Sequence, residues 1–108
     1  MRHKEFRKIV KDLHDLAEKE MNKKQPEYTN ENSDVLHNFK STAEKLRVDN
    51  LKVWAVFFEK QTQSIIAHIN NKDLKFSEKI ESRFADIINY ACLGLALFQE
   101  RQKDEEEK

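Results

Sequence analysis

The stretch Glu81–Leu93, ESRFADIINYACL, decides the expected fold because it combines the apolar residues of a packed helix with several polar groups. An α-helix turns about 100° per residue, so the segment from Ile80 onward presents two apolar sides. The first side, which we expect to face the main core, comprises Ile80, Phe84, Ile87, Ala91, Leu95 and Phe98. The roughly opposite side comprises Asp86, Tyr90, Leu93 and Leu97. A helix with two apolar sides needs cover on both, which predicts a helical bundle that also forms a homo-oligomer.

Asp86 stands at the polar end of the second side, with Arg83 one turn before it and Asn89 one turn after it. A buried carboxylate must be paired, hydrogen-bonded or bound to a cation, because an isolated charge in a dry site is strongly destabilising. One interpretation is an ion pair between Arg83 and Asp86 at i, i+3. The other is that Asp86 faces a bound ligand.

The composition favours an all-α fold. The chain has 108 residues with one Gly and one Pro, which supply few of the turns that a many-stranded sheet needs. Twenty basic and twenty acidic residues cancel, so no overall field attracts nucleic acid or an acidic membrane surface. A single Cys, no signal-like N-terminal run and no apolar segment of membrane-spanning length predict a cytoplasmic protein that does not enter a membrane.

Apolar residues at helical spacing predict four helices joined by loops, that is, a four-helix bundle. The expected ranges are 2–22, 32 or 33 to 45, 49–70 and 77–100, with a loop over 23–34. The expected N-caps are Asn32 or Ser33, Asp49 and Ser77. Residues 1–100 form one domain in this interpretation, and the charged residues 101–108 form a disordered tail.

Two blocks of the chain resemble a known family. The first is YTNENSDVLHNFKSTAEKL, residues 28–46; the second is the 81–93 stretch, and a helix containing Trp54 and Lys60 separates them. Over residues 23–97 the sequence resembles the first nucleotide-modification-associated domain family of phages and prophages. That family is related to the all-α nucleotide pyrophosphohydrolases of MazG type. The resemblance rests on Tyr28, Asn32, Asp34, Leu36, Asn38, Phe39, Lys60, Glu81, Arg83, Asp86, Asn89 and Tyr90.

The resemblance implies an oligomeric helical bundle that handles a nucleotide or a nucleotide-derived ligand in a bacterial host cell. The implied ligand-binding residues are Tyr28, Asn32, Asn38, Lys60, Arg83, Asn89 and Tyr90. In this interpretation Tyr28 stacks on the base, and the two Asn side chains of the first block bind its edge. Lys60, with Lys23 or Lys24, neutralises phosphate, and Arg83 holds phosphate through two hydrogen bonds.

An enzymatic interpretation requires Mg²⁺, for which carboxylates are the expected ligands. The resemblance implies Asp34, Glu81 and Asp86 as metal ligands, with Glu81 and Asp86 in catalytic roles and Glu78 as a further candidate ligand. The sequence departs from the MazG pattern, however. The first acidic motif is absent, the second becomes Asp86-x-x-Asn89, and Lys60 is followed by Gln61 rather than His.

Three functions therefore remain open from the sequence. The first is a magnesium-dependent nucleotide hydrolase, and the second is a binder that sequesters a signalling nucleotide of anti-phage defence without hydrolysing it. The third is a helical adaptor for another protein. The four His residues lack the spacing of a zinc site, and Cys92, flanked by Ala91 and Leu93, is expected to be a small core residue.

Overall fold

A computed structural model describes the backbone of residues 1–29 and 34–107 and the side chains of residues 1–24 and 34–107. These residues form four helices and no strand: α1 (His3–Thr29), α2 (His37–Leu46), α3 (Asn50–Asn70) and α4 (Ile80–Glu106). The prediction of an all-α fold with four helices is confirmed. No helix in the described part of the chain is both long enough and apolar enough to cross a membrane.

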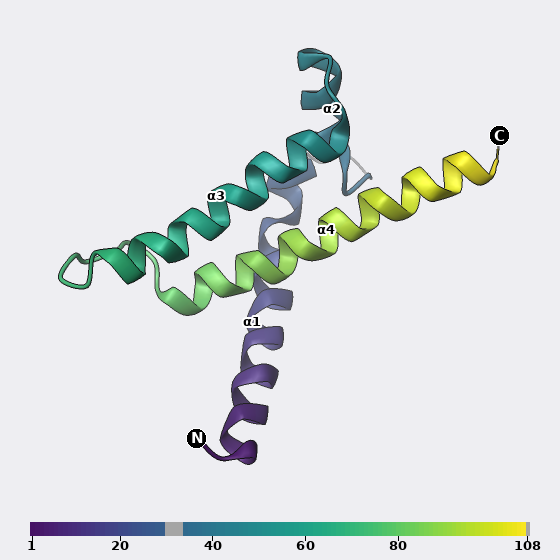
Figure 1. Cartoon of the computed structure of the whole chain (residues 1–108). Helices are drawn as coiled ribbons and strands as arrows, with labels where there is room; N and C mark the ends of the chain where they lie inside the picture. Colours follow the sequence, from purple (N-terminus) through teal and green to yellow (C-terminus); the bar gives the residue numbers. More distant parts are fainter. Residues whose placement is uncertain (30–33, 108) are drawn as a thin grey trace.

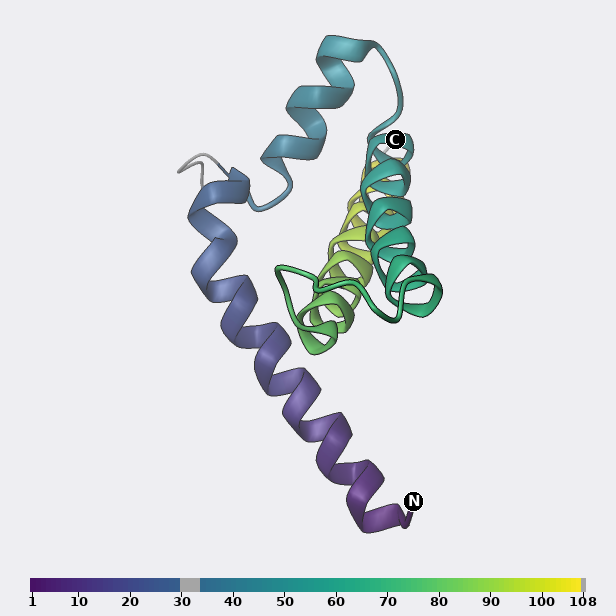
Figure 2. The same cartoon turned by 90° about the vertical axis from the view of Figure 1, so that its left-hand side faces the viewer.

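The antiparallel pair of α3 and α4 is the centre of the fold. These two helices lie side by side, and α1 crosses α4 (Figures 1 and 2). The short helix α2 follows the C-terminal end of α1 and packs against α3. The N-terminal half of α1 extends away from the α3–α4 pair, so the elements do not form a closed cylinder of parallel helices.

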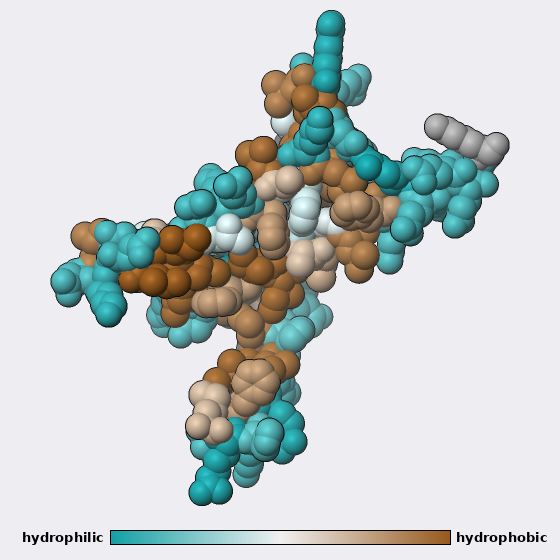
Figure 3. All heavy atoms as spheres, viewed as in Figure 1, coloured by the Kyte–Doolittle hydropathy of each residue, from teal (hydrophilic) through white to brown (hydrophobic). Residues whose placement is uncertain are grey.

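The molecule is elongated and leaves much apolar surface exposed. Its radius of gyration is 16.3 Å, whereas a compact domain of this length has a value of about 13 Å. Figure 3 shows apolar side chains spread over α3 and α4 and over the protruding half of α1. The chain by itself therefore buries less of its apolar surface than a compact domain of the same size would.

The helix starts agree with the predicted caps only in part. Asp49 is the N-cap of α3, and its carboxylate accepts a hydrogen bond from the backbone N–H of Leu51 at 2.8 Å, as predicted. The second helix starts later than predicted, because Asp34 accepts the N–H of Leu36 at 2.9 Å in a turn that precedes it. The alternative caps Asn32 and Ser33 lie outside the described residues. The predicted Ser77 cap is wrong, since α4 begins at Ile80 after Lys79.

Two helices extend beyond their predicted ends. The first helix was expected to stop at Asn22, but α1 continues to Thr29, and Lys24 in this extension pairs with Asp86 of α4. The residues expected to form a disordered tail are helical as far as Glu106. Arg101 within this segment pairs with Asp49 at the start of α3. Ion pairs with neighbouring helices thus stabilise both extended segments. The spacing of apolar residues does not reveal such ion pairs.

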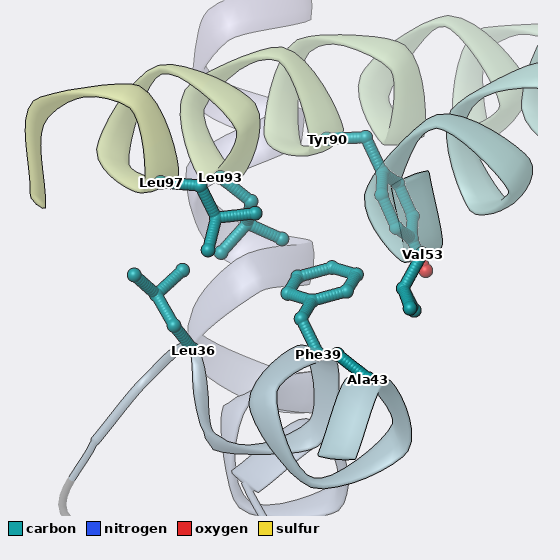
Figure 4. Close-up of a cluster of buried hydrophobic side chains, with 7 residues drawn as sticks. All are labelled: Leu36, Phe39, Ala43, Val53, Tyr90, Leu93 and Leu97. Atoms are coloured by element: carbon teal, nitrogen blue, oxygen red, sulfur yellow. The ribbon is translucent and has the colours of Figure 1, made fainter. Parts of the chain in front are cut away.

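The buried side of α4 is the opposite of the one predicted. Phe84, Leu95 and Phe98, expected in the main core, are 44%, 59% and 48% exposed. The core instead comprises Leu36, Phe39, Ala43, Val53, Tyr90, Leu93 and Leu97, whose side chains converge between α2, α3 and α4 (Figure 4). The small residues Ala85 and Gly94 are buried on α4 as well, and small side chains allow neighbouring helices to approach closely.

Trp54 and Gly94 fix the distance between α3 and α4. A Cβ atom at position 94 would overlap the six-membered ring of the Trp54 indole. The indole Nε1–H donates a hydrogen bond of 2.7 Å to the backbone carbonyl of Tyr90, and the ring stacks on Phe58 with centroids 5.0 Å apart. The hydrogen bond and the stacking leave the indole little freedom to move, so glycine is required at this position.

We expect Gly94→Ala to lower the free energy of unfolding by about 1–2 kcal/mol. Displacing the indole costs more than the helix gains from alanine, which is about 1 kcal/mol better than glycine in a helix interior. Urea unfolding followed by circular dichroism measures the change. In a Trp54→Ala background the same substitution should be stabilising, because the space is then empty. Stabilisation in the wild-type background would contradict this account of the contact.

Candidate functional site

An apolar cleft of about 400 Å³ lies between α2 and α4, with α1 and α3 contributing to its walls. It is lined by Met21, Val35, Asn38, Phe39, Thr42, Phe57, Tyr90, Cys92, Leu93 and Ala96. Residues from all four helices or their immediate flanks thus meet around one space. Its volume falls within the range of about 300–1,000 Å³ that is common for small-molecule sites.

Aromatic rings form the walls of the cleft, and a few polar groups interrupt them. Phe39 packs edge-to-face against both Phe57 and Tyr90, with centroid distances of 6.0 and 6.4 Å. Asn38 and Thr42 lie one turn apart on α2 and supply an amide and a hydroxyl. Such a cleft suits a flat aromatic ring that also carries hydrogen-bonding groups.

A group of charged residues adjoins the cleft where α1 meets α4. The ammonium of Lys24 lies 3.5 Å from Asp86 Oδ1 and 3.4 Å from Glu20 Oε2. Lys24 follows the cleft residue Met21 by one helical turn, and Asp86 precedes the cleft residue Tyr90 by one turn. Side chains three or four positions apart are neighbours on a helix, so this charged group borders the cleft.

Asp86 is the only buried charged residue among the described side chains, at 7% exposure. Burial raises the pKa of its carboxyl group, because a charge is less stable away from water. The ammonium of Lys24 opposes this shift in pKa, and the negative charge of Glu78 adds to it. Asp86 and Lys24 thus form a partly desolvated ion pair, and the nearby charge of Glu78 weakens it.

The neighbours of Asp86 differ from the predicted ones. The predicted Arg83–Asp86 ion pair is wrong, because Asp86 pairs with Lys24 while Arg83 NH1 lies 3.4 Å from Glu78 Oε2. The side-chain amide of Asn89 donates a hydrogen bond of 2.9 Å to the backbone carbonyl of Ala17. Asn89 therefore attaches α4 to α1.

The other predicted ligand-binding residues are only partly brought together. Asn38 and Tyr90 both line the cleft. Lys60 is exposed on α3 and is not among the lining residues. Tyr28 belongs to α1, at a position where the backbone alone is described, and Asn32 lies outside the described residues.

Sequence reasoning named only Asn38 and Tyr90 as ligand-binding residues among the ten residues that line the cleft. Thr42 follows Asn38 by four positions, a spacing that already indicated a shared helix face. Met21 and Phe57 also line the cleft, and the sequence does not distinguish them from core residues because their apolar side chains fit a core stripe equally well. Cys92, expected to be buried, is exposed and lines the cleft instead.

The proposed magnesium ligands do not form a metal site. Asp34 forms a 2.6 Å ion pair with Lys40, and this contact lowers the pKa of the Asp34 carboxyl group. Asp86 is paired with Lys24, and Glu81 is exposed on another side of α4. No group of three His, Cys, Asp or Glu residues in the described part of the chain is placed to hold a metal ion. These carboxylates therefore do not fit Mg²⁺.

Comparison of the chain with protein-family models, with curated proteins and with solved structures gives no match. The relationship to the phage family, which rests on the two sequence blocks, therefore stays a prediction. The cleft and the adjacent Lys24–Asp86 pair are the structural observations on which a proposed function can rest.

We expect Asp86 to make stability depend on pH in a defined direction. The pKa of Asp86 is raised above its ordinary value of 3.8, so in the window between the two values the folded state holds a proton that the unfolded state has lost. The free energy of unfolding should therefore fall as the pH rises through this window. Relative to Asp86→Asn, wild type should lose stability between pH 3.8 and the raised pKa.

Urea unfolding of both proteins across a pH series measures this difference. Glu81→Gln is the matched control, because it removes an exposed carboxylate from the same helix. If wild type gains stability relative to Asp86→Asn as the pH rises, attraction to Lys24 outweighs burial and the expected sign is wrong.

Proposed function

We propose that the chain binds a nucleotide or a nucleotide-derived ligand in the apolar cleft and does not hydrolyse it. The observation that carries the proposal is an aromatic-walled space bordered by a lysine. Phe39 and Tyr90 offer ring contacts to a base, and Asn38 offers an amide that matches the donors and acceptors of a base edge. Asn38 and Phe39 come from α2 and Tyr90 from α4, so the fold is needed to bring them together.

Lys24 is the proposed phosphate contact. Its ammonium contacts both Glu20 and Asp86, and a phosphate oxygen would take the place of one of its present partners. Part of the long side chain remains accessible, at 27% exposure. A phosphate near Lys24 would leave the attached base one or two turns away, at the level of Met21 and Tyr90 in the cleft.

Binding without hydrolysis is favoured over catalysis by the geometry of the acidic residues. Cleavage of a diphosphate needs oxygen ligands gathered around a cation, and Asp34, Glu81 and Asp86 are not gathered. Asn89, which stands at the second acidic position of the MazG pattern, is hydrogen-bonded to the backbone of α1. The biological role that the resemblance then suggests is sequestration of a signalling nucleotide of anti-phage defence in a bacterial host cell.

We also propose that the protein acts as a homo-oligomer. The elongated shape and the exposed Phe84, Leu95 and Phe98 on the outer side of α4 support this proposal. A second copy of the chain is the partner that we propose for these exposed side chains, because it is present wherever the chain itself is present.

The test is a panel of nucleotides, including cyclic forms, added at millimolar concentration with and without Mg²⁺. We expect at least one nucleotide to raise the melting temperature of wild type, because a ligand in excess over its dissociation constant stabilises the folded state. Chromatography of the same samples should recover the nucleotide unchanged. Lys24→Met should abolish the rise, whereas Lys23→Met, which removes the adjacent exposed lysine, should keep it.

The ligand-induced shift is compared within each variant, since Lys24→Met also changes the surroundings of Asp86. If no nucleotide raises the wild-type melting temperature, the cleft is not a nucleotide site and the adaptor function gains support. If a cleaved product forms only in the presence of Mg²⁺, the protein is a nucleotide hydrolase and the proposal of binding without hydrolysis is wrong.

A further inference from the structure

The N-terminal segment of the chain, residues 2–13, carries an apolar stripe along the start of α1 that faces solvent, and we call this segment the arm. Phe6, Ile9 and Val10 are 56%, 46% and 39% exposed. Figures 1 and 2 show the arm extending beyond the α3–α4 pair. The arm is the first part of the 27-residue helix α1, and an exposed apolar stripe of this kind marks a surface for packing.

A second exposed apolar stripe runs along the outer side of α4. It contains Phe84, Leu95 and Phe98. Glu105 and Glu106 follow Phe98 by seven and eight positions, about two turns later, so they continue the same side toward the C-terminal end of α4. This outer stripe is therefore apolar in its middle and acidic at its C-terminal end.

The amount of exposed surface matches a large interface between two copies. The chain exposes 8697 Å², whereas a compact monomer of 12.9 kDa exposes about 6,300 Å². The excess of about 2,400 Å² per chain is close to the upper end of what one partner buries in an obligate homodimer, whose interfaces cover about 2,000–5,000 Å² in total. Covering the arm and the outer stripe together would account for a large part of this excess.

The charges at the two ends of the chain are complementary. Residues 1–13 contain five basic and two acidic side chains, a net charge of +3. Residues 99–108 contain five acidic and three basic side chains, a net charge of −2. Opposite charges favour contact between the arm of one copy and the C-terminal part of α4 in another.

We propose that two copies exchange arms across a two-fold axis. The arm of each copy packs antiparallel along the outer stripe of the other. The spacing of the two stripes sets the register: Leu13 lies opposite Leu95 and Val10 opposite Phe98. Arg2 then lies opposite Glu106, since both are eleven residues from the leucines. The contact is made twice because a two-fold interface is reciprocal.

Charge reversal and mixing test this exchange. The arm variant is Arg2→Glu, and the α4 variant is Glu106→Arg, because these two residues lie opposite each other in this register. Acidic residues near the start of a helix and basic residues near its end are compatible with the helix dipole, so both variants should keep their helices, which circular dichroism checks. The mass in solution is measured by light scattering at micromolar concentration without nucleotide, so the outcome is independent of ligand binding.

We expect wild type to be a dimer with twice the chain mass of 12.9 kDa. For each variant alone, the dissociation constant of the dimer should be at least tenfold higher. An equimolar mixture of the two variants should regain the dimer, because each reversed arm then meets a reversed α4 and each original arm meets an original α4. Lys4→Glu is the matched control, with the same charge change on the opposite side of the arm, and should remain dimeric.

Three results would overturn the proposal. A monomeric wild type would show that these stripes are not covered by a second copy. Failure of the mixture to regain the dimer, with both variants folded, would show that arm and α4 do not meet. An assembly larger than a dimer would replace the two-fold exchange with arms that pass from copy to copy.

Discussion

The contact of Trp54 with Gly94 is the constraint on which the rest of the structure depends. The indole lies against a helix backbone that has no side chain at that point, and its N–H donates to the Tyr90 carbonyl one turn earlier on α4. This brings α3 close to α4 and fixes which side of α4 faces inward. Tyr90 is on that side and becomes a wall of the cleft, and Asp86, one turn before it, is brought against α1.

The sequence predicted the number and type of the helices, because apolar spacing and the Asp49 cap are local signals. It predicted the wrong buried side of α4, since two apolar sides of one helix look alike in periodicity. Gly94 was the one available signal. A glycine in the interior of a helix is costly and therefore indicates a close helix contact on its own side.

The candidate site was predictable only in part. Asn38 and Tyr90 were named from the sequence and do meet at the cleft, whereas Arg83 and Asn89 bind neighbouring protein groups instead. The pairing of Lys24 with Asp86 joins residues 62 positions apart and depends on the extension of α1 beyond Asn22. Long-range ion pairs of this kind follow from the packing of helices, which a single sequence does not reveal.

The shallow core has a thermodynamic consequence. None of the large described side chains is completely shielded from solvent, so unfolding a single chain exposes less new apolar surface than unfolding a compact domain does. The heat-capacity change of unfolding and the sensitivity to denaturant both scale with that surface. The stability curve of the isolated chain should therefore be flat over temperature, and covering its exposed apolar side chains would make the curve steeper.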